Sequence, residues 1–359
     1  MISTKKHIIL FFAEQTELSR YYSKLFKSFK KNSNHKLYFL NMVQGEAFAS
    51  QIKPDIEQYY SLELINKYFK GLPKLIKYIK KINPTIIHSH EYIPTFYISL
   101  ALLLSRSKAK LIYHRHHNQT LGIKNRLFDF ISSLLSHKII TVSKAMMLLA
   151  GKEHPLFKYK TSFILNGIDL DSKITSDFNL VKREVMILLL GRFREVKGHT
   201  IAIEAFQKLK TEYNSIGLYL AGDGPLEESI RKKVEDLSLT SDIFFLGRVE
   251  DVKNLINQMT LMIVPSIVEP FGLVAIEGLA AKKLVIASKV GGLLEILEDK
   301  KTGALVEHSN PEALFTAIDY YLKNPQKRDE LAQKGYNHYL KYFTSEVMAK
   351  NYLDLYEAL

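Results

Sequence analysis

The chain has 359 residues, which is long for one domain and sufficient for two. It contains no cysteine, so disulfide bonds and thiolate metal sites are excluded, and a reducing compartment is expected. The formal net charge of +13 is uneven, because residues 1–170 carry 26 Lys and Arg against 10 Asp and Glu, whereas residues 171–359 carry 24 against 27. A basic first half indicates an anionic partner, although a generally lysine-rich composition would give the same asymmetry.

Apolar, strand-like runs alternate with helical patterns along the whole chain. Strands are predicted at 7–13, 36–42, 85–89, 110–114, 138–142 and 162–165, and then at 185–190, 216–221, 243–246, 261–264, 284–287 and 304–306. Helices between them include 17–31, 66–82, 198–213, 225–237, 272–281, 292–298, 311–323 and 326–336. Alternation at this spacing predicts an α/β fold with parallel sheets and crossover helices.

A turn at 166–169, followed by a polar and unpatterned stretch to Lys182, predicts a domain boundary. We therefore expect two Rossmann-like domains, 1–170 and 171–343, facing a central cleft. No apolar run reaches 18 residues, and the longest, Ile93–Leu104, suits a buried helix. The first apolar run is too short for a signal peptide. A cytoplasmic protein is expected, with or without peripheral attachment to the inner face of the plasma membrane.

The segment 264–280, VPSIVEPFGLVAIEGLA, predicts a buried strand, a tight turn and the first turns of a helix. Gly272 permits close backbone approach, and a helix start offers N–H groups to a phosphate. Glu269 and Glu277 would lie about 12 Å apart if both were helical, at roughly 1.5 Å per residue. A hydrolase acid/base pair needs about 5 to 9.5 Å. The two carboxylates are therefore interpreted as separate hydroxyl-binding groups.

The segment 190–198, LGRFREVKG, follows the first strand of the second half and opens a helix. Open α/β sheets bind ligands at this position. Two long cationic side chains in this segment could neutralise a departing diphosphate. The alternative is a solvated basic loop. The turn 221–225, AGDGP, is interpreted as structural, and Gly291, Gly292 and Glu295 open another helix.

Two strands of the first half end in histidines, at 88 and 90 and at 114, 116 and 117. A metal site is disfavoured, because Glu91 is the one carboxylate nearby and zinc ligands usually have regular spacing. The helix at 64–82 is rich in lysine and could lie on an anionic bilayer. Gly71 and Pro73 interrupt it, so a solvated helix face is the favoured interpretation. No nucleic-acid reading motif is present, and no nucleic-acid partner is expected.

Together these motifs resemble the retaining glycosyltransferases of the GT-B fold with an E-x7-E signature (glycosyltransferase family 4, glycosyl transferases group 1). The resemblance covers nearly all of the second half and the first half more loosely. It implies transfer of a hexosyl or N-acetylhexosaminyl group from a nucleotide-diphosphate sugar to a hydroxyl. A UDP-sugar is favoured, UDP-GlcNAc among the candidates, and a surface glycan or lipid-linked molecule is the expected acceptor. No metal or cofactor is expected, because two cations neutralise the diphosphate.

The resemblance also assigns roles to residues. Glu277 would bind the ribose and Glu269 the donor sugar, while Arg192 and Lys197 would bind the diphosphate. Arg194 has no matching role in the family motif and is expected at the surface. His116 would bond the sugar near its anomeric carbon. Catalytic roles thus fall on Glu269, His116, Arg192 and Lys197. Donor binding would also use the backbone or side chains of Gly191, Gly247, Arg248, Val249, Phe271, Gly272 and Leu273. His90 and Thr16 would line the cleft, and the last helix, 344–359, would cross back to the first domain.

The chain departs from the family pattern at the first strand-to-helix turn. The family usually has glycines there, but residues 13–18 read AEQTEL. Two alternatives stay open. One is a nucleotide-sugar epimerase or hydrolase on the same fold, which needs no acceptor. The other is a non-catalytic donor-binding subunit of a transferase complex, which the missing glycine loop favours.

Overall fold

The computed structural model describes residues 6–13, 19–43, 49–50, 52–63, 68–116, 122–170, 178 and 180–359. The chain divides into two compact units. Unit 1 comprises Met1–Gly167 and Thr344–Leu359, and unit 2 comprises Ile168–Phe343. Within the described ranges, no helix combines the length and the apolar character needed to cross a bilayer.

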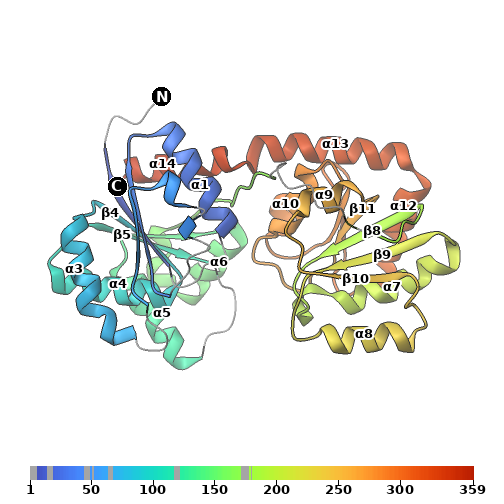
Figure 1. The fold of residues 1–359 in the computed structure, drawn as a ribbon, viewed down its shortest axis with the longest axis horizontal. Coiled ribbons are helices and arrows are strands. Elements are labelled where there is room, and N and C mark those ends of the chain that lie inside the picture. The colour runs from blue at the N-terminus through green and yellow to red at the C-terminus, as the bar shows by residue number, and fades with distance from the viewer. Residues whose placement is uncertain are drawn as a thin grey trace. The chain divides into compact units, whose positions relative to one another are not determined.

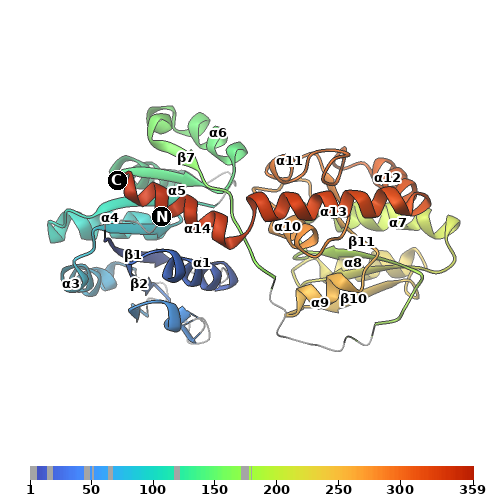
Figure 2. The same ribbon diagram turned by 90° about the horizontal axis from the view of Figure 1, so that it is seen from above.

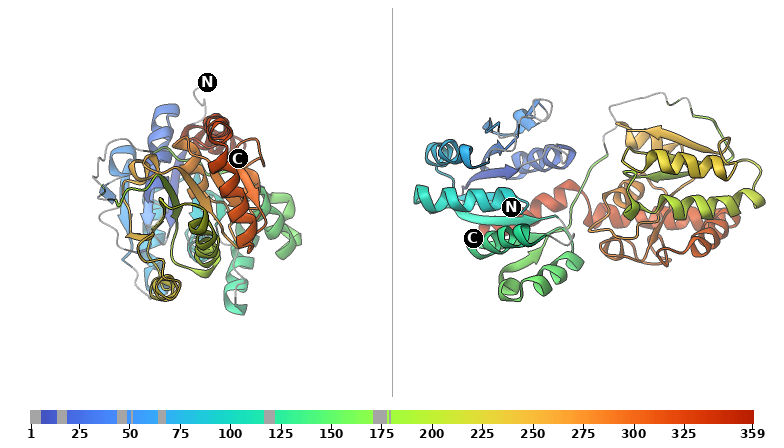
Figure 3. Two further views of the ribbon diagram at one scale, coloured as in Figure 1. Left: turned by 90° about the vertical axis from the view of Figure 1, so that its right-hand side faces the viewer. Right: turned by 90° about the horizontal axis from the view of Figure 1, so that it is seen from below.

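Unit 1 is built on a seven-stranded parallel sheet in the order β3-β2-β1-β4-β5-β6-β7, with helices on both faces (Figures 1 and 3). Its strands are β1 (Ile8–Ala13), β2 (Lys36–Asn41), β3 (Gln58–Ser61), β4 (Ile86–His90), β5 (Lys110–Arg115), β6 (Lys138–Thr141) and β7 (Thr161–Phe163). Its helices are α1 (Ser19–Asn32), α3 (Leu72–Ile82), α4 (Tyr92–Ser105), α5 (Ile123–Leu135), α6 (Lys144–Glu153) and α14 (Ser345–Glu357), with 3-10 turns η1 (Lys53–Asp55), η2 (Tyr68–Gly71) and η3 (Pro155–Lys160).

The C-terminal helix α14 belongs to unit 1, where it lies beside α1 (Figure 2). Its inner face contributes Met348, Tyr352 and Tyr356, all fully buried, to the core formed with Phe11 and Phe29. Burial of several large side chains fixes this helix to the sheet, since each contributes roughly 1.5–3 kcal/mol. The last helix of the chain is therefore part of the helical layer that covers one face of the first sheet.

Unit 2 is built on a six-stranded parallel sheet in the order β10-β9-β8-β11-β12-β13 (Figure 1). Its strands are β8 (Val185–Leu190), β9 (Ile216–Ala221), β10 (Ile243–Gly247), β11 (Leu261–Val264), β12 (Val285–Ser288) and β13 (Ala304–Val306). Its helices are α7 (His199–Glu212), α8 (Glu227–Asp236), α9 (Val252–Asn257), α10 (Leu273–Ala280), α11 (Leu293–Ile296), α12 (Pro311–Lys323) and α13 (Pro325–Tyr342), with the 3-10 turn η4 (Glu195–Lys197).

The predicted architecture of two parallel-sheet α/β domains is confirmed, and four strands of unit 2 begin and end where predicted. The short strand β3 was not predicted, because four residues carry little pattern. Helix α13 continues to Tyr342 instead of ending near Gly335. That glycine lies inside the helix, and an added Cβ would approach the carbonyl oxygen of Thr302 to 2.6 Å. It therefore serves close packing, not helix termination.

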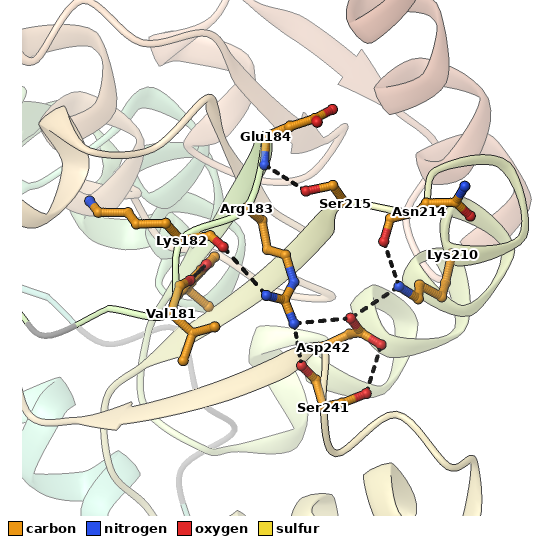
Figure 4. A network of polar contacts seen from close by, with 10 residues as sticks. Val181, Lys182, Arg183, Glu184, Lys210, Asn214, Ser215, Ser241 and Asp242 are labelled. Carbon is orange, nitrogen blue, oxygen red and sulfur yellow. Dashed lines mark hydrogen bonds and ion pairs between the residues drawn. The ribbon is translucent and has the colours of Figure 1, made fainter.

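An ion-pair network joins the segments that precede β8, β9 and β10, at the edge of the sheet where these strands begin (Figure 4). The buried carboxylate of Asp242 accepts a hydrogen bond from Lys210 Nζ at 3.0 Å and lies 3.6 Å from the guanidinium of Arg183. The same guanidinium donates to the carbonyl oxygen of Ser241 at 2.9 Å. These contacts fix the N-terminal edge of the sheet, opposite the edge where ligands of such sheets bind.

We expect Asp242→Asn to lower the free energy of unfolding by about 2 kcal/mol, because two partly buried cations lose their counter-charge. The exposed Asp236→Asn substitution on α8 is the matched control and should change stability by less than about 0.5 kcal/mol. Urea denaturation measures both. Equal midpoints for the two variants would contradict the structural role of the network.

Candidate functional site

In unit 2, the loops that follow β8 and β11 meet at the C-terminal edge of the sheet. Ile267 N donates to the carbonyl oxygen of Val196 at 2.8 Å and ties the second loop to η4. Gly198 follows η4 with a φ of 70°, and an added Cβ there would overlap the carbonyl oxygen of Pro265. The close contact of the two loops therefore requires glycine at this position.

This contact places two of the predicted site residues against each other. Lys197 Nζ donates to Glu269 Oε2 at 2.6 Å, and the Ser266 hydroxyl lies 3.0 Å from the same oxygen. The Glu269 side chain is only 9% exposed, whereas that of Lys197 is 27% exposed. The pair is thus a charge-assisted hydrogen bond with a sheltered carboxylate and a more accessible ammonium. The sequence predicted both residues at the site but not their direct contact.

Gly291 and Gly292 hold the backbone that carries Glu269. Gly292 N donates to the Glu269 carbonyl oxygen at 3.0 Å. An added Cβ at Gly291 would overlap that oxygen, and one at Gly292 would overlap the Cα of Phe271. Only glycines permit the two backbone segments to lie this close together. The pair therefore fixes the backbone position from which the Glu269 side chain extends.

Helix α10 begins directly after this segment. Gly272, with a φ of 114°, occupies the N-cap, and the first turn leaves backbone N–H groups without intrahelical partners, as every α-helix does. Glu277 is half-buried and lies four residues after Leu273, so both occupy one helix face. Side chains on a helix tilt toward its N-terminus, which directs the Glu277 carboxylate toward that first turn. Phe271, which precedes the N-cap, is buried.

Arg192 projects from the loop after β8 and is about half exposed, with its Nε 3.9 Å from the Asp223 carboxylate. Gly191 lies in ordinary contact range of the Lys197 side chain. Arg194 is exposed, as predicted. These residues follow the ends of β8 and β9, so the strand order of the sheet brings them together on one edge.

The other predicted donor-binding residues follow β10 on the same edge. Gly247 has a φ of 63° and open space at its Cβ position, and its carbonyl oxygen accepts from Gly222 N at 2.8 Å. Arg248 is exposed and Val249 half-buried. Open space beside a positive-φ glycine leaves the backbone of this turn accessible.

In unit 1, the histidines at the ends of β4 and β5 form a stacked cluster. His90 Nδ1 lies 2.9 Å from His116 Nε2, and His88 Nε2 lies 3.3 Å from His114 Nδ1. The hydroxyl of Tyr356 on α14 lies 2.7 Å from His88 Nδ1, so His88 contacts both Tyr356 and His114. The His90–His116 contact is separate from these and lies beside them through ring stacking.

Burial lowers the pKa of His88 to about 3, with a smaller contribution from the neighbouring His116. Burial also lowers the pKa of His90 and of His114 well below the ordinary value of 6.5, and nearby histidines add to both shifts. These three imidazoles are therefore neutral at pH 7. Their nitrogens lie within 4.8 Å of one another, but rings 88 and 90 stack at 9°, and the expectation of no bound metal stays a prediction.

The lowered pKa values of these histidines predict that the folded protein is less stable in acid. Between pH 6.5 and about 3 the unfolded chain binds a proton at His88 and the folded protein does not, so stability falls as pH falls. From pH 7.5 to pH 5, each such histidine should cost about 2 kcal/mol. Urea denaturation at the two pH values measures this, and His88→Gln should flatten the dependence. Equal stability at both pH values would contradict neutral burial.

Not every predicted site residue can be located in the structure. Thr16, His117 and the glycine-free segment 14–18 lie outside the described residues. Ser266, Gly198 and Tyr356 contribute to these sites but were not predicted to do so. The first two lie within recognised motifs, and a serine three residues before a site glutamate could have been noted. Tyr356 and His88 are 268 positions apart, so no local pattern could reveal their contact.

The sequence matches the family described as Glycosyl transferases group 1 over residues 171–338, and Glycosyltransferase Family 4 over residues 32–172. It is 31% identical over 307 residues to an uncharacterised glycosyltransferase of Methanocaldococcus jannaschii, covering 82% of this chain and 83% of the relative. It is 24% identical over 344 residues to the N-acetyl-alpha-D-glucosaminyl L-malate synthase of Bacillus anthracis, covering 90% and 89%.

Among solved structures, HepE of Anabaena in complex with UDP and with UDP-glucose is similar, with a TM-score of 0.82 and 18% identity over 98% of this chain and 100% of HepE. At 18% sequence identity, this structural similarity establishes a shared fold and does not extend to function. The family assignment rests on three findings. The structure has two parallel sheets, the family matches cover both halves of the chain, and the Methanocaldococcus jannaschii relative aligns with 82% of it. This chain belongs to the glycosyl transferases group 1, glycosyltransferase family 4, and has the GT-B fold.

Proposed function

We propose that this protein transfers a sugar from a UDP-sugar to an acceptor hydroxyl with retention of anomeric configuration. The observation that carries the proposal is the Lys197–Glu269 pair, held by glycines beside the start of α10. A cation and a sheltered carboxylate at the C-terminal edge of a parallel sheet suit a ligand with an anionic part and a hydroxyl-rich part.

Each group has a chemical task in this proposal. Arg192, Lys197 and the first-turn N–H groups of α10 stabilise the diphosphate as it leaves, without a metal ion. Glu277 accepts hydrogen bonds from the ribose hydroxyls and Glu269 from the donor sugar. The bond from the anomeric carbon to the phosphate oxygen breaks, and the acceptor oxygen attacks from the same face. The departing phosphate oxygen takes the acceptor proton.

The remaining assignments are also part of the proposal. His116, whose Nε2 lies 2.9 Å from His90 Nδ1, bonds the donor sugar. The backbone at Gly247, Arg248 and Val249 contacts the base. UDP is favoured because HepE binds it, and UDP-GlcNAc is supported by the N-acetylglucosaminyl transfer named for the Bacillus anthracis relative. A surface glycan or lipid-linked acceptor suits the basic first half of the chain.

A panel of nucleotide sugars tests the donor. Thermal unfolding should shift upward most with UDP and the true UDP-sugar, since ligand at about 100 times its dissociation constant adds roughly 2.7 kcal/mol of stability. Release of UDP is then measured with and without candidate acceptors, and NMR determines the anomer of the product. Acceptor-dependent release with retention supports the proposal.

The other outcomes are equally informative. Acceptor-independent turnover of the nucleotide sugar would favour the epimerase or hydrolase alternative. Saturable binding without turnover across the whole acceptor panel would favour a non-catalytic donor-binding subunit. Stabilisation by GDP- or ADP-sugars in place of UDP-sugars would overturn the donor assignment alone.

A further inference from the structure

Helix α5 presents an apolar face outward, in addition to the apolar residues that it packs against the core. Its outward side chains include Ile123, Leu127 and Leu134, which are 90%, 56% and 51% exposed. With Phe130 they occupy positions i, i+4, i+7 and i+11, which is a single helix face. The opposite face buries polar groups, among them Ser132 and Asp129. Phe128 and Ile131 pack against the core, so the outward face is a second apolar face of the same helix.

The buried polar groups explain why the helix docks in this orientation. Asp129 accepts from the Tyr113 hydroxyl at 2.5 Å and pairs with Arg115 at 3.4 Å and with His154 at 2.8 Å. The Ser132 hydroxyl donates to the carbonyl oxygen of Tyr92 at 2.9 Å. Rotating α5 to bury its leucines would break this network, so the apolar stripe faces outward in the folded protein.

The stripe continues onto neighbouring elements. The ring of Phe130 lies 5.3 Å from that of Phe157 on η3, which also carries the exposed side chains of Leu156 and Tyr159. Lys160 Nζ donates to the Leu134 carbonyl oxygen at 3.0 Å and joins η3 to the end of α5. The apolar surface defined by residues 123, 127, 130, 134, 156 and 159 is called the α5 surface below.

Charge in the segment that carries the α5 surface is mainly positive. Residues 122–160 contain seven Lys and Arg and two carboxylates, Asp129 and Glu153. Both carboxylates pair with the buried Arg115; Asp129 is itself buried, and the Glu153 side chain is 35% exposed. Arg126 and Lys158 are exposed beside the stripe. An apolar stripe flanked by cations, with both nearby carboxylates paired to an arginine, complements an anionic lipid surface.

We infer that the α5 surface docks this protein on an anionic bilayer, with the apolar side chains entering the interface and Arg126 and Lys158 contacting lipid phosphates. The stripe is a single convex helix face about 16 Å long at 1.5 Å per residue, which suits lying in the membrane plane. Tyr159 has the amphipathic ring favoured at that depth. The inference does not depend on the proposed donor or acceptor.

The lysine-rich helix α3 is the alternative membrane contact suggested by the sequence. Its apolar residues Leu75, Ile79 and Ile82 are buried, and its exposed face carries lysines. Such a face attracts anionic lipid only through screened charge. The α5 surface adds apolar insertion, which salt does not screen. The two helices therefore make different predictions.

The test measures co-sedimentation of the full chain with vesicles of phosphatidylcholine alone or mixed with phosphatidylglycerol, without nucleotide sugar. Wild-type protein should bind the mixed vesicles and retain binding at 0.15 M salt, where the Debye length is about 8 Å. The triple variant Ile123→Gln, Leu127→Gln, Leu134→Gln should bind at least about tenfold more weakly, because buried apolar area sets interfacial affinity. Quadruple replacement of Lys74, Lys77, Lys80 and Lys81 by Gln should have a smaller effect.

Matched single variants separate insertion from general surface change. Leu127→Gln should weaken vesicle binding, whereas Leu340→Gln, at a leucine 48% exposed on α13 of unit 2, should not. Thermal unfolding checks that both remain folded. Equal vesicle binding by the triple variant and wild type would overturn the inference. So would wild-type dimerisation, abolished in the triple variant, without vesicle binding, because the surface would then be a protein interface.

Discussion

Replacing Lys197 with alanine is expected to lower kcat by roughly 100- to 1,000-fold, the usual cost of losing one preorganised charge donor in the transition state. The ammonium is the more accessible member of its pair with Glu269, so it can also contact an incoming diphosphate. Binding of UDP should weaken less than kcat falls, because charge builds up on the diphosphate as the bond to the sugar breaks. Steady-state kinetics with the UDP-sugar measures both.

The fold of the Lys197→Ala variant should persist. Glu269 keeps its contact with Ser266, and losing one charged hydrogen bond should cost at most about 1.5–3 kcal/mol. Lys289→Ala is the control, since that exposed lysine pairs with Glu307 after β13 and should leave kcat unchanged. Near wild-type kcat in the Lys197 variant, with saturable donor kinetics, would remove the diphosphate assignment.

Much of unit 2 could be predicted because its strands are near-continuous apolar runs buried on both faces. Val185–Leu190 and Ile216–Ala221 each end at a loop that carries site residues, so the strand pattern also locates the site. The contact between Lys197 and Glu269 could not be predicted. It joins residues 72 positions apart, and it depends on Gly198 lying against Pro265 in the folded chain.

The site in unit 1 was harder to predict from the sequence, because its contacts also join residues far apart in the chain. The histidines of β4 and β5 were recognised as a cluster, but their partner Tyr356 comes from the far end of the chain. The apolar residues of α5 lie on more than one of its faces, and the buried partners of Asp129 and Ser132 set its orientation. Long-range polar contacts therefore determine the orientation of a helix and the partners of a side chain, which local periodicity does not specify.

Glu269→Gln and Glu277→Gln are expected to give different binding phenotypes. Glu277 lies on α10, and its loss should weaken UDP and the UDP-sugar alike, by about 10-fold or more, because hydrogen bonds to charged groups contribute about 1.5–3 kcal/mol. Glu269→Gln should leave UDP binding unchanged or slightly tighter, since it removes the anion that competes for Lys197. Its kcat should nevertheless fall by at least about 100-fold, because the donor sugar loses a charged partner.

Calorimetric titration of both ligands into both variants distinguishes these outcomes, and the double variant Lys197→Ala, Glu269→Gln measures how the two groups interact. Because their side chains are in contact, the losses in kcat should not add, and the interaction energy should be about 0.5–3 kcal/mol. Glu298→Gln, at a glutamate whose side chain is 54% exposed just after α11, is the charge-matched control. Identical losses of UDP affinity at 269 and 277 would mean that the carboxylate nearer Lys197 also holds the nucleotide, and that the division between sugar and ribose is misassigned.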